Sequence, residues 1–175
     1  ISFMAAVILI LIVGFFLRYK NFALVPRPGE STDEYSNTWV GISLLQLGTP
    51  VGRSGLVGYG GNDYRYINVD RIFSTTAGGS PLEINRPWLD HPPLLSLLTG
   101  GFAYISGTRV FEDATSRIIR KPMIVLGTVT IALVGYLAFL ISGGTAAILA
   151  MALFATSPLI VVTSRMVQGE NGLMI

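Results

Sequence analysis

The chain has 175 residues, of which 51% are hydrophobic and 13% are charged, with a formal net charge of +2, one histidine and no cysteine. A soluble domain carries about a quarter charged residues, and the mean hydropathy is +0.60, so a water-exposed globule and a disordered chain are both excluded and a membrane protein is predicted. The missing cysteine excludes disulfides, zinc–thiolate sites and thiol nucleophiles, and the small positive charge is typical of membrane flanks rather than of nucleic-acid binding.

Residues 1–17 are almost entirely apolar and are predicted to form the first transmembrane helix, with Arg18 and Lys20 at its membrane boundary. Because no small-residue cleavage site follows, this segment is not interpreted as a signal peptide. The chain begins inside this apolar run and stops at residues 173–175 as another run starts. We therefore expect it to be the front portion of a longer membrane protein.

Residues 18–91 are polar and rich in turn-forming residues, which predicts a structured loop on the membrane surface. Long loops of this kind are usually functional. Within the loop, the spacing of Trp39, Ile42 and Leu45 predicts a helix over about 34–47 that lies along the interface, with Ser31 or Thr32 as its N-cap. Seven of the ten acidic residues lie in this loop: Glu30, Asp33, Glu34, Asp63, Asp70, Glu83 and Asp90.

The second half of the chain is apolar again and is interrupted by one basic turn. The fold class predicted from this pattern is an all-α polytopic membrane protein with about four transmembrane helices and one long extracytoplasmic loop. The elements expected after the loop are a short second transmembrane helix at 92–106, a basic turn at 107–121, a third helix at 122–142, a fourth at 145–163 and a connection to a further helix at 164–175.

The distribution of basic residues gives the expected orientation. The short 107–121 turn carries four basic residues, which favours the cytoplasmic side. Arg18 and Lys20 argue for the opposite orientation, but long loops escape the charge rule. We expect residues 18–91 outside the cytoplasm, in the plasma or inner membrane or in the endoplasmic reticulum.

Two acidic positions are candidates for chemistry. Asp33 and Glu34 are adjacent acids at the start of the interfacial helix, where they could act as a general base or a cation ligand, or simply favour the positive end of the helix. Asp90 precedes the only histidine, His91, at the threshold of a membrane helix. Ionisable groups at that depth are functional candidates, although an N-terminal cap with a histidine at headgroup level explains the pair equally well.

A third pair, Arg165 and Glu170, follows the fourth helix, where a cationic membrane anchor and a solvated acid are the simpler interpretation. One histidine beside several carboxylates is compatible with a divalent metal ion, with Asp33, Asp90 and His91 as the candidate ligands. These ligands are too scattered in the sequence to assign a metal site. The glycine-rich runs lack the neighbours of a phosphate-binding loop.

Four short motifs follow one another along the chain in an order that can be compared with known families. They are Asp33-Glu34, then Asp90-His91-Pro92-Pro93-Leu94, then Ser116 to Pro122 with Leu126-Gly127 after it, and finally Ser157-Pro158 with Ser164-Arg165 and Glu170. This ordered set resembles the membrane-embedded GT-C glycosyltransferases, in the branch of the dolichyl-phosphate-mannose protein mannosyltransferases and aminoarabinose transferases. The likeness covers the N-terminal portion of such a protein.

The resemblance implies that a sugar is moved, with inversion, from a polyprenyl-phosphate donor to a protein hydroxyl or a lipid acceptor within the membrane lipid. Asp33 matches the catalytic acid position and would act as the general base, with Glu34 supporting it and Asp90 as a second acid. His91 stands where some relatives carry lysine, so its charge contact to phosphate depends on protonation. The implied substrate-binding residues are His91, Arg117, Arg165 and Glu170.

Two other classes of protein remain open from the sequence. The first is a non-catalytic, glycosyltransferase-like subunit of a larger membrane complex, because a chain of this length lacks the later helices of the family. The second is a fragment of a transporter or channel, which is disfavoured because the acids gather in the loop and not within the apolar helices.

Overall fold

The computed structural model describes residues 2–28, 33–53, 84–85, 87–88, 91, 93–109 and 113–168. Apart from one pair of two-residue strands, the regular structure in these ranges is helical. The elements are α1 (Phe3–Tyr19), α2 (Asp33–Leu47), β1 (Gly52–Arg53), β2 (Ile84–Asn85), α3 (Pro93–Ile105), α4 (Ser116–Ile119), α5 (Lys121–Thr156) and α6 (Pro158–Thr163).

The chain divides into two compact units, which are described separately. Within the described ranges, unit 1 contains residues 2–28 and 120–166, and unit 2 contains residues 33–119 with Val167 and Gln168. Unit 1 therefore holds α1, α5 and α6, and unit 2 holds α2, α3, α4 and the strand pair.

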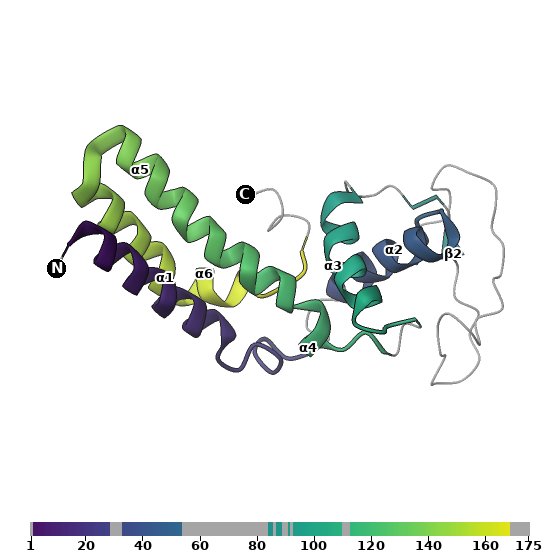
Figure 1. Ribbon diagram of the computed structural model, residues 1–175. Coiled ribbons are helices and arrows are strands. Elements are labelled where there is room, and N and C mark those ends of the chain that lie inside the picture. Colours follow the sequence, from purple (N-terminus) through teal and green to yellow (C-terminus); the bar gives the residue numbers. More distant parts are fainter. Residues whose placement is uncertain are drawn as a thin grey trace. The chain divides into compact units, whose positions relative to one another are not determined.

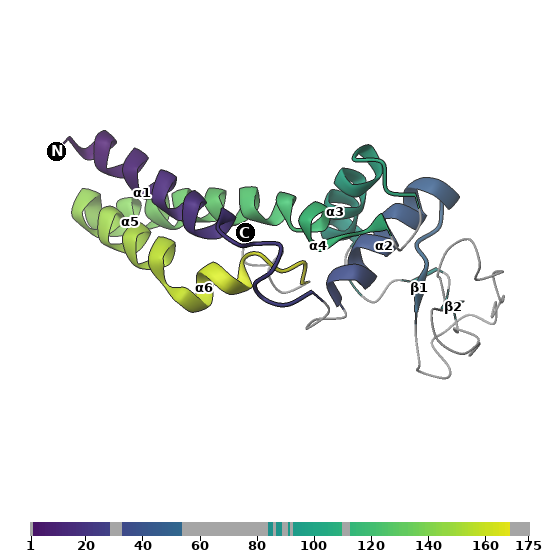
Figure 2. The same ribbon diagram turned by 90° about the horizontal axis from the view of Figure 1, so that it is seen from below.

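Unit 1 is a helical bundle in which α1 runs alongside α5 (Figures 1 and 2). The helix α5 reverses direction at Gly143, whose φ of 80° and ψ of −171° are not helical. A Cβ atom at Gly135 would overlap the side chain of Met151, so the two arms of α5 pack closely against each other. The reversal falls within Ser142-Gly143-Gly144, where the sequence predicts the separation of the third and fourth helices.

The interior of unit 1 is small and its outer surface is apolar. Ile131, Met151 and Ala155 form a buried cluster against α1. Large apolar side chains of α1 and α5 are exposed, including Met4, Ile12, Phe16, Leu137 and Leu140, each of which exposes more than half of its surface. An apolar exterior around a thin core fits a lipid environment better than water.

One helical stretch in the described ranges, Ser116–Thr156, is long and apolar enough to cross a membrane, while α1 and α3 are shorter apolar helices. The four predicted crossings are therefore not confirmed. The 13 residues of α3 extend for about 20 Å at the rise of an α-helix, and a hydrocarbon core is about 30 Å thick. The structure thus gives a helix at the predicted place, and its described length is below the thickness of a hydrocarbon core.

Unit 2 is built on the packing of α2 against α3. A Cβ atom at Gly41 would overlap the carbonyl oxygen of Ser96, and one at Gly100 would lie 2.6 Å from backbone atoms of Gly41 and Ile42. The two helices meet backbone to backbone because both positions lack side chains. Trp39 and Ile42, which belong to the apolar stripe predicted for residues 34–47, are both buried.

The remaining regular structure of unit 2 is a short antiparallel ladder. Gly52 pairs with Asn85 and Arg53 pairs with Ile84. The chain between α2 and β1 is held by a hydrogen bond from the buried Val51 N–H to Ser43 Oγ at 2.8 Å. The ladder thus begins directly beside the C-terminal half of α2.

Candidate functional site

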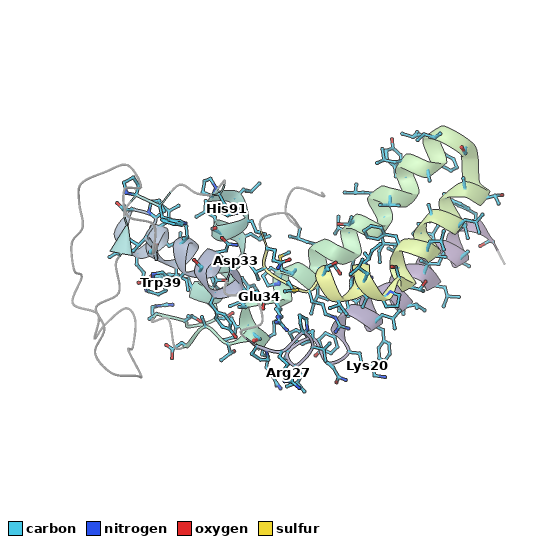
Figure 3. The ribbon with its side chains drawn as sticks, turned by 180° about the vertical axis from the view of Figure 1, so that it is seen from behind. Lys20, Arg27, Asp33, Glu34, Trp39 and His91 are labelled. Carbon is cyan, nitrogen blue, oxygen red and sulfur yellow. The ribbon has the colours of Figure 1, made fainter. Side chains whose placement is uncertain are left out.

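The N-terminus of α2 separates its two acidic residues. Asp33 is the first residue of the helix and is exposed, whereas Glu34 is fully buried. Successive residues of an α-helix point about 100° apart, so two adjacent acids can differ in burial, as these two do. Figure 3 shows both side chains at this end of α2. The predicted N-cap residues, Ser31 and Thr32, lie outside the described residues.

Glu34 is held by the backbone that follows α6. Its Oε1 accepts a hydrogen bond from Val167 N–H at 3.2 Å. One turn further along α2, the amide Nδ2 of Asn37 donates to the carbonyl oxygen of Val167 at 3.5 Å. Val167 belongs to the same unit as α2 and is fully buried. A buried carboxylate needs such partners because its desolvation is otherwise costly.

The second predicted acidic motif is only partly described. His91 is exposed and lies just before the first residue of α3 (Figure 3). Asp90 lies outside the described residues, as does Glu170. Within the described ranges, no group of three or more histidine, aspartate or glutamate side chains is arranged to hold a metal ion.

The two predicted arginines have different surroundings. Arg117 is exposed on α4. Arg165 is buried just after α6 and donates hydrogen bonds to the carbonyl oxygens of Val25, at 3.1 Å, and of Leu17. Burial, followed by the nearby positive charge of Arg120, lowers the pKa of Arg165. Arg165 therefore joins the end of α6 to the end of α1.

Arg165 is one of three buried arginines in unit 1, and the other two were not predicted as site residues. Arg18 is fully buried and donates to the carbonyl oxygens of Gly14 and Ala155, at 3.1 and 3.2 Å. Arg120 is fully buried and donates to those of Phe22 and Pro26, each at 2.8 Å. A sequence signal does exist, because each arginine adjoins the end of an apolar run, but it does not show that the side chain turns inward.

The contacts of Arg120 bear on the orientation of the chain. From the sequence, residues 18–91 and residues 107–121 are expected on opposite sides of the membrane. Arg120 bonds to the backbone of Phe22 and Pro26, at the beginning of the long loop. These hydrogen bonds hold Arg120 beside the segment that follows α1, and a topology based on them is proposed below.

Comparison with known proteins gives one match. Residues 90–175 match the model of a family described as dolichyl-phosphate-mannose-protein mannosyltransferase. The family resemblance is confirmed for these residues. Neither the curated proteins nor the solved structures gave a match. His91, Arg117 and Arg165 lie within the part that matches the mannosyltransferase family, whereas Asp33 and Glu34 precede it.

The similarity of residues 90–175 to the mannosyltransferase family points to a general class of protein. The family comprises membrane-integral glycosyltransferases, and it uses a dolichyl-phosphate-sugar donor and a protein acceptor in general. The apolar exterior of unit 1 and the long apolar stretch Ser116–Thr156 agree with a membrane location. The family match suggests a membrane glycosyltransferase of the mannosyltransferase type.

Proposed function

We propose that this chain is the N-terminal part of an integral-membrane glycosyltransferase that moves a sugar from a polyprenyl-phosphate donor to a protein hydroxyl or a lipid acceptor, with inversion. The observation that carries the proposal is the separation of the two acids at the start of α2, where Asp33 is exposed and Glu34 is buried. An exposed carboxylate can reach an acceptor. The family match of residues 90–175 supports the reaction class.

In the proposed reaction, the Asp33 carboxylate accepts the proton of the acceptor hydroxyl. The hydroxyl oxygen forms a bond to the anomeric carbon as the bond from that carbon to the donor phosphate oxygen breaks. The polyprenyl phosphate leaves with the electron pair of the broken bond. The attack comes from the face opposite the phosphate, so the configuration at the anomeric carbon inverts.

The other proposed site residues differ in how exposed their side chains are. His91 and Arg117 are both exposed in unit 2 and can offer positive charge or N–H donors to the donor phosphate. Arg165 bonds to backbone carbonyls of unit 1, so in this proposal it supports the fold of that unit and does not contact the donor. Asp90 and Glu170, outside the described residues, keep the second-acid and substrate-binding roles that the resemblance implies. A divalent metal ion with Asp33, Asp90 and His91 as ligands remains part of the hypothesis.

Replacing Asp33 tests the proposed base. Asp33→Asn removes the proton acceptor but keeps the shape of the side chain, and is expected to reduce sugar transfer at least about a hundredfold. Transfer from polyprenyl-phosphate sugars to peptide and lipid acceptors would be measured with the full-length protein in membranes. Asp113→Asn is the matched control, because Asp113 is another exposed acid of unit 2, and its transfer should stay within about twofold of the unsubstituted protein.

Two results would contradict this proposal in different ways. Unchanged transfer by the Asp33→Asn variant would remove Asp33 from the chemistry while leaving the enzyme assignment in place. Absence of transfer by the unsubstituted protein, from every polyprenyl-phosphate donor tried, would overturn the assignment and favour the non-catalytic subunit.

We further propose that three segments of unit 1 cross the membrane: α1, the first arm of α5, and the second arm together with α6. The ends of these segments support this topology, since Arg120 bonds to the chain just after α1 and Arg165 bonds to Leu17 within α1. Residues 18–28 and Lys121 lie on one side, the extracytoplasmic side, and the reversal at Gly143 lies on the other.

Cysteine labelling checks this topology, and the chain contains no native cysteine to interfere. Lys20, Lys121 and Ser142 are exposed residues of unit 1. In sealed vesicles, a membrane-impermeant thiol reagent should label the Lys20→Cys and Lys121→Cys variants from the same side and the Ser142→Cys variant only from the other. Labelling of Lys20→Cys and Lys121→Cys from opposite sides would restore the topology predicted from the sequence.

A further inference from the structure

Two residues near the start of α2 bond to both backbone polar groups of a single residue distant in sequence. The Val167 N–H donates to Glu34 Oε1, and the Val167 carbonyl oxygen accepts from Asn37 Nδ2. Glu34 and Val167 are fully buried and Asn37 exposes only 7% of its surface. The match with the mannosyltransferase family does not extend to α2, so it assigns no role to this pair of hydrogen bonds.

The spacing of the two side chains explains how they hold one residue. Residues three apart on an α-helix lie on the same face, about one turn from each other. Glu34 and Asn37 can therefore face one extended residue as a neighbouring strand would, with an acceptor for its N–H and a donor for its carbonyl oxygen. Either a carboxylate or a side-chain amide oxygen can accept from the N–H, whereas a methyl group cannot.

This contact lies next to Asp33 in the chain. Glu34 is bonded from its side chain to Val167 and from its carbonyl oxygen to Thr38 Oγ1, at 2.8 Å. Asp33 precedes Glu34 by one residue and is exposed. The bond to Val167 therefore anchors the helix end that carries the proposed base.

We propose that Glu34 and Asn37 are positioning residues: they hold the backbone of Val167 against the start of α2 and so direct Asp33 toward the acceptor, without exchanging a proton with the substrate. The role of Asp33 in this statement rests on the proposed function. The hydrogen bonds that hold Val167 do not, so experiments can contradict the role of Asp33 and the hold on Val167 independently.

Amide hydrogen exchange tests the hold on Val167 without reference to activity. In the full-length protein, Glu34→Ala is expected to speed exchange of the Val167 amide about tenfold or more, since a buried N–H loses its acceptor. Glu34→Gln keeps an acceptor oxygen and should change the exchange by less than about threefold. Ser36→Ala is the matched control, because Ser36 lies on the same turn and makes no hydrogen bond through its side chain with the rest of the described chain.

Sugar transfer by the same variants tests the positioning role. Glu34→Gln should retain most of the turnover of the unsubstituted protein with an unchanged pH profile, whereas Glu34→Ala should lose about tenfold or more in kcat. Asn37→Ala, which leaves Glu34 in place, should reduce kcat in the same direction by a smaller factor. All rates are compared per folded molecule, from thermal unfolding of each variant.

Two outcomes would overturn the inference. If Glu34→Gln loses as much turnover as Asp33→Asn, or shifts the pH profile, Glu34 takes part in proton transfer and is not a positioning residue. If Glu34→Ala leaves exchange of the Val167 amide unchanged, the hydrogen bond does not hold that segment. If Glu34→Ala speeds exchange of the Val167 amide but the unsubstituted protein transfers no sugar, the hold on Val167 is supported and the proposed function is overturned.

Discussion

Gly100→Ala is expected to destabilise the packing of α2 on α3 by about 3 kcal/mol or more, because overpacking at a rigid contact costs this much. The added Cβ would lie 2.6 Å from the Cα and carbonyl carbon of Gly41 and 2.6 Å from the nitrogen of Ile42. All three are backbone atoms, which cannot move aside as a flexible side chain can. The two helices would have to separate, and the close backbone contact between them would be lost.

Gly101→Ala is the matched control for this prediction. The nearest atom to a Cβ at Gly101 is Cδ1 of Leu45 at 3.9 Å, which is an ordinary contact. Because alanine is also the better helix former, this variant should be as stable as the unsubstituted protein or more stable, by up to about 1 kcal/mol. Thermal unfolding of the full chain in detergent would measure both. Equal stability of Gly100→Ala and Gly101→Ala would show that the helices do not meet as described.

Arg120→Met is expected to destabilise unit 1 by about 3 kcal/mol, because buried backbone carbonyls lose their charged donor. Arg120 is fully buried and its Nη1 donates to the carbonyl oxygens of both Phe22 and Pro26. Methionine fills a similar volume but offers no N–H. Arg120→Lys keeps the charge but not the forked geometry of the guanidinium, so it should recover only part of the loss.

The neighbouring Lys121→Met variant separates the hydrogen bonds from the loss of charge. Lys121 is exposed, so its replacement should change stability by less than about 0.5 kcal/mol. Thermal unfolding of the variants in the same detergent would be compared, with hydrogen exchange of residues 20–25 as a local readout. Equal destabilisation by Arg120→Met and Lys121→Met would show that net charge, and not the link from Arg120 to the loop, stabilises this end of unit 1.

Much of the local structure follows from the sequence. The predicted helix at 34–47 is α2, the predicted helix at 92–106 is α3, and the separation expected at 142–144 is the reversal of α5. Each of these features has a local physical cause. Apolar spacing and an acidic first turn start α2, a proline stands at the start of α3, and a glycine supplies the positive φ at the reversal.

The sequence could not show which of the two acids of the candidate site is exposed. Asp33 and Glu34 are adjacent, and both are acceptable in the first turn of a helix. Only the contact with Val167, more than 130 residues away in the chain, shows that Glu34 turns inward and Asp33 outward. The charge rule for membrane loops likewise counts Arg120 as an exposed basic residue of a turn, whereas its guanidinium is buried and donates hydrogen bonds to backbone carbonyls.

The sequence by itself determined that this is a membrane protein, where α2 and α3 lie in the chain, and the resemblance of residues 90–175 to a glycosyltransferase family, since composition, periodicity and motif order are properties of the linear chain. Tertiary structure alone decided that α3 packs through Gly100 onto Gly41 and that Asp33 is the exposed acid. It also decided that three arginines of unit 1 are buried and donate hydrogen bonds to backbone carbonyls. These features depend on hydrogen bonds and close contacts between segments far apart in the chain. No local pattern encodes such partners.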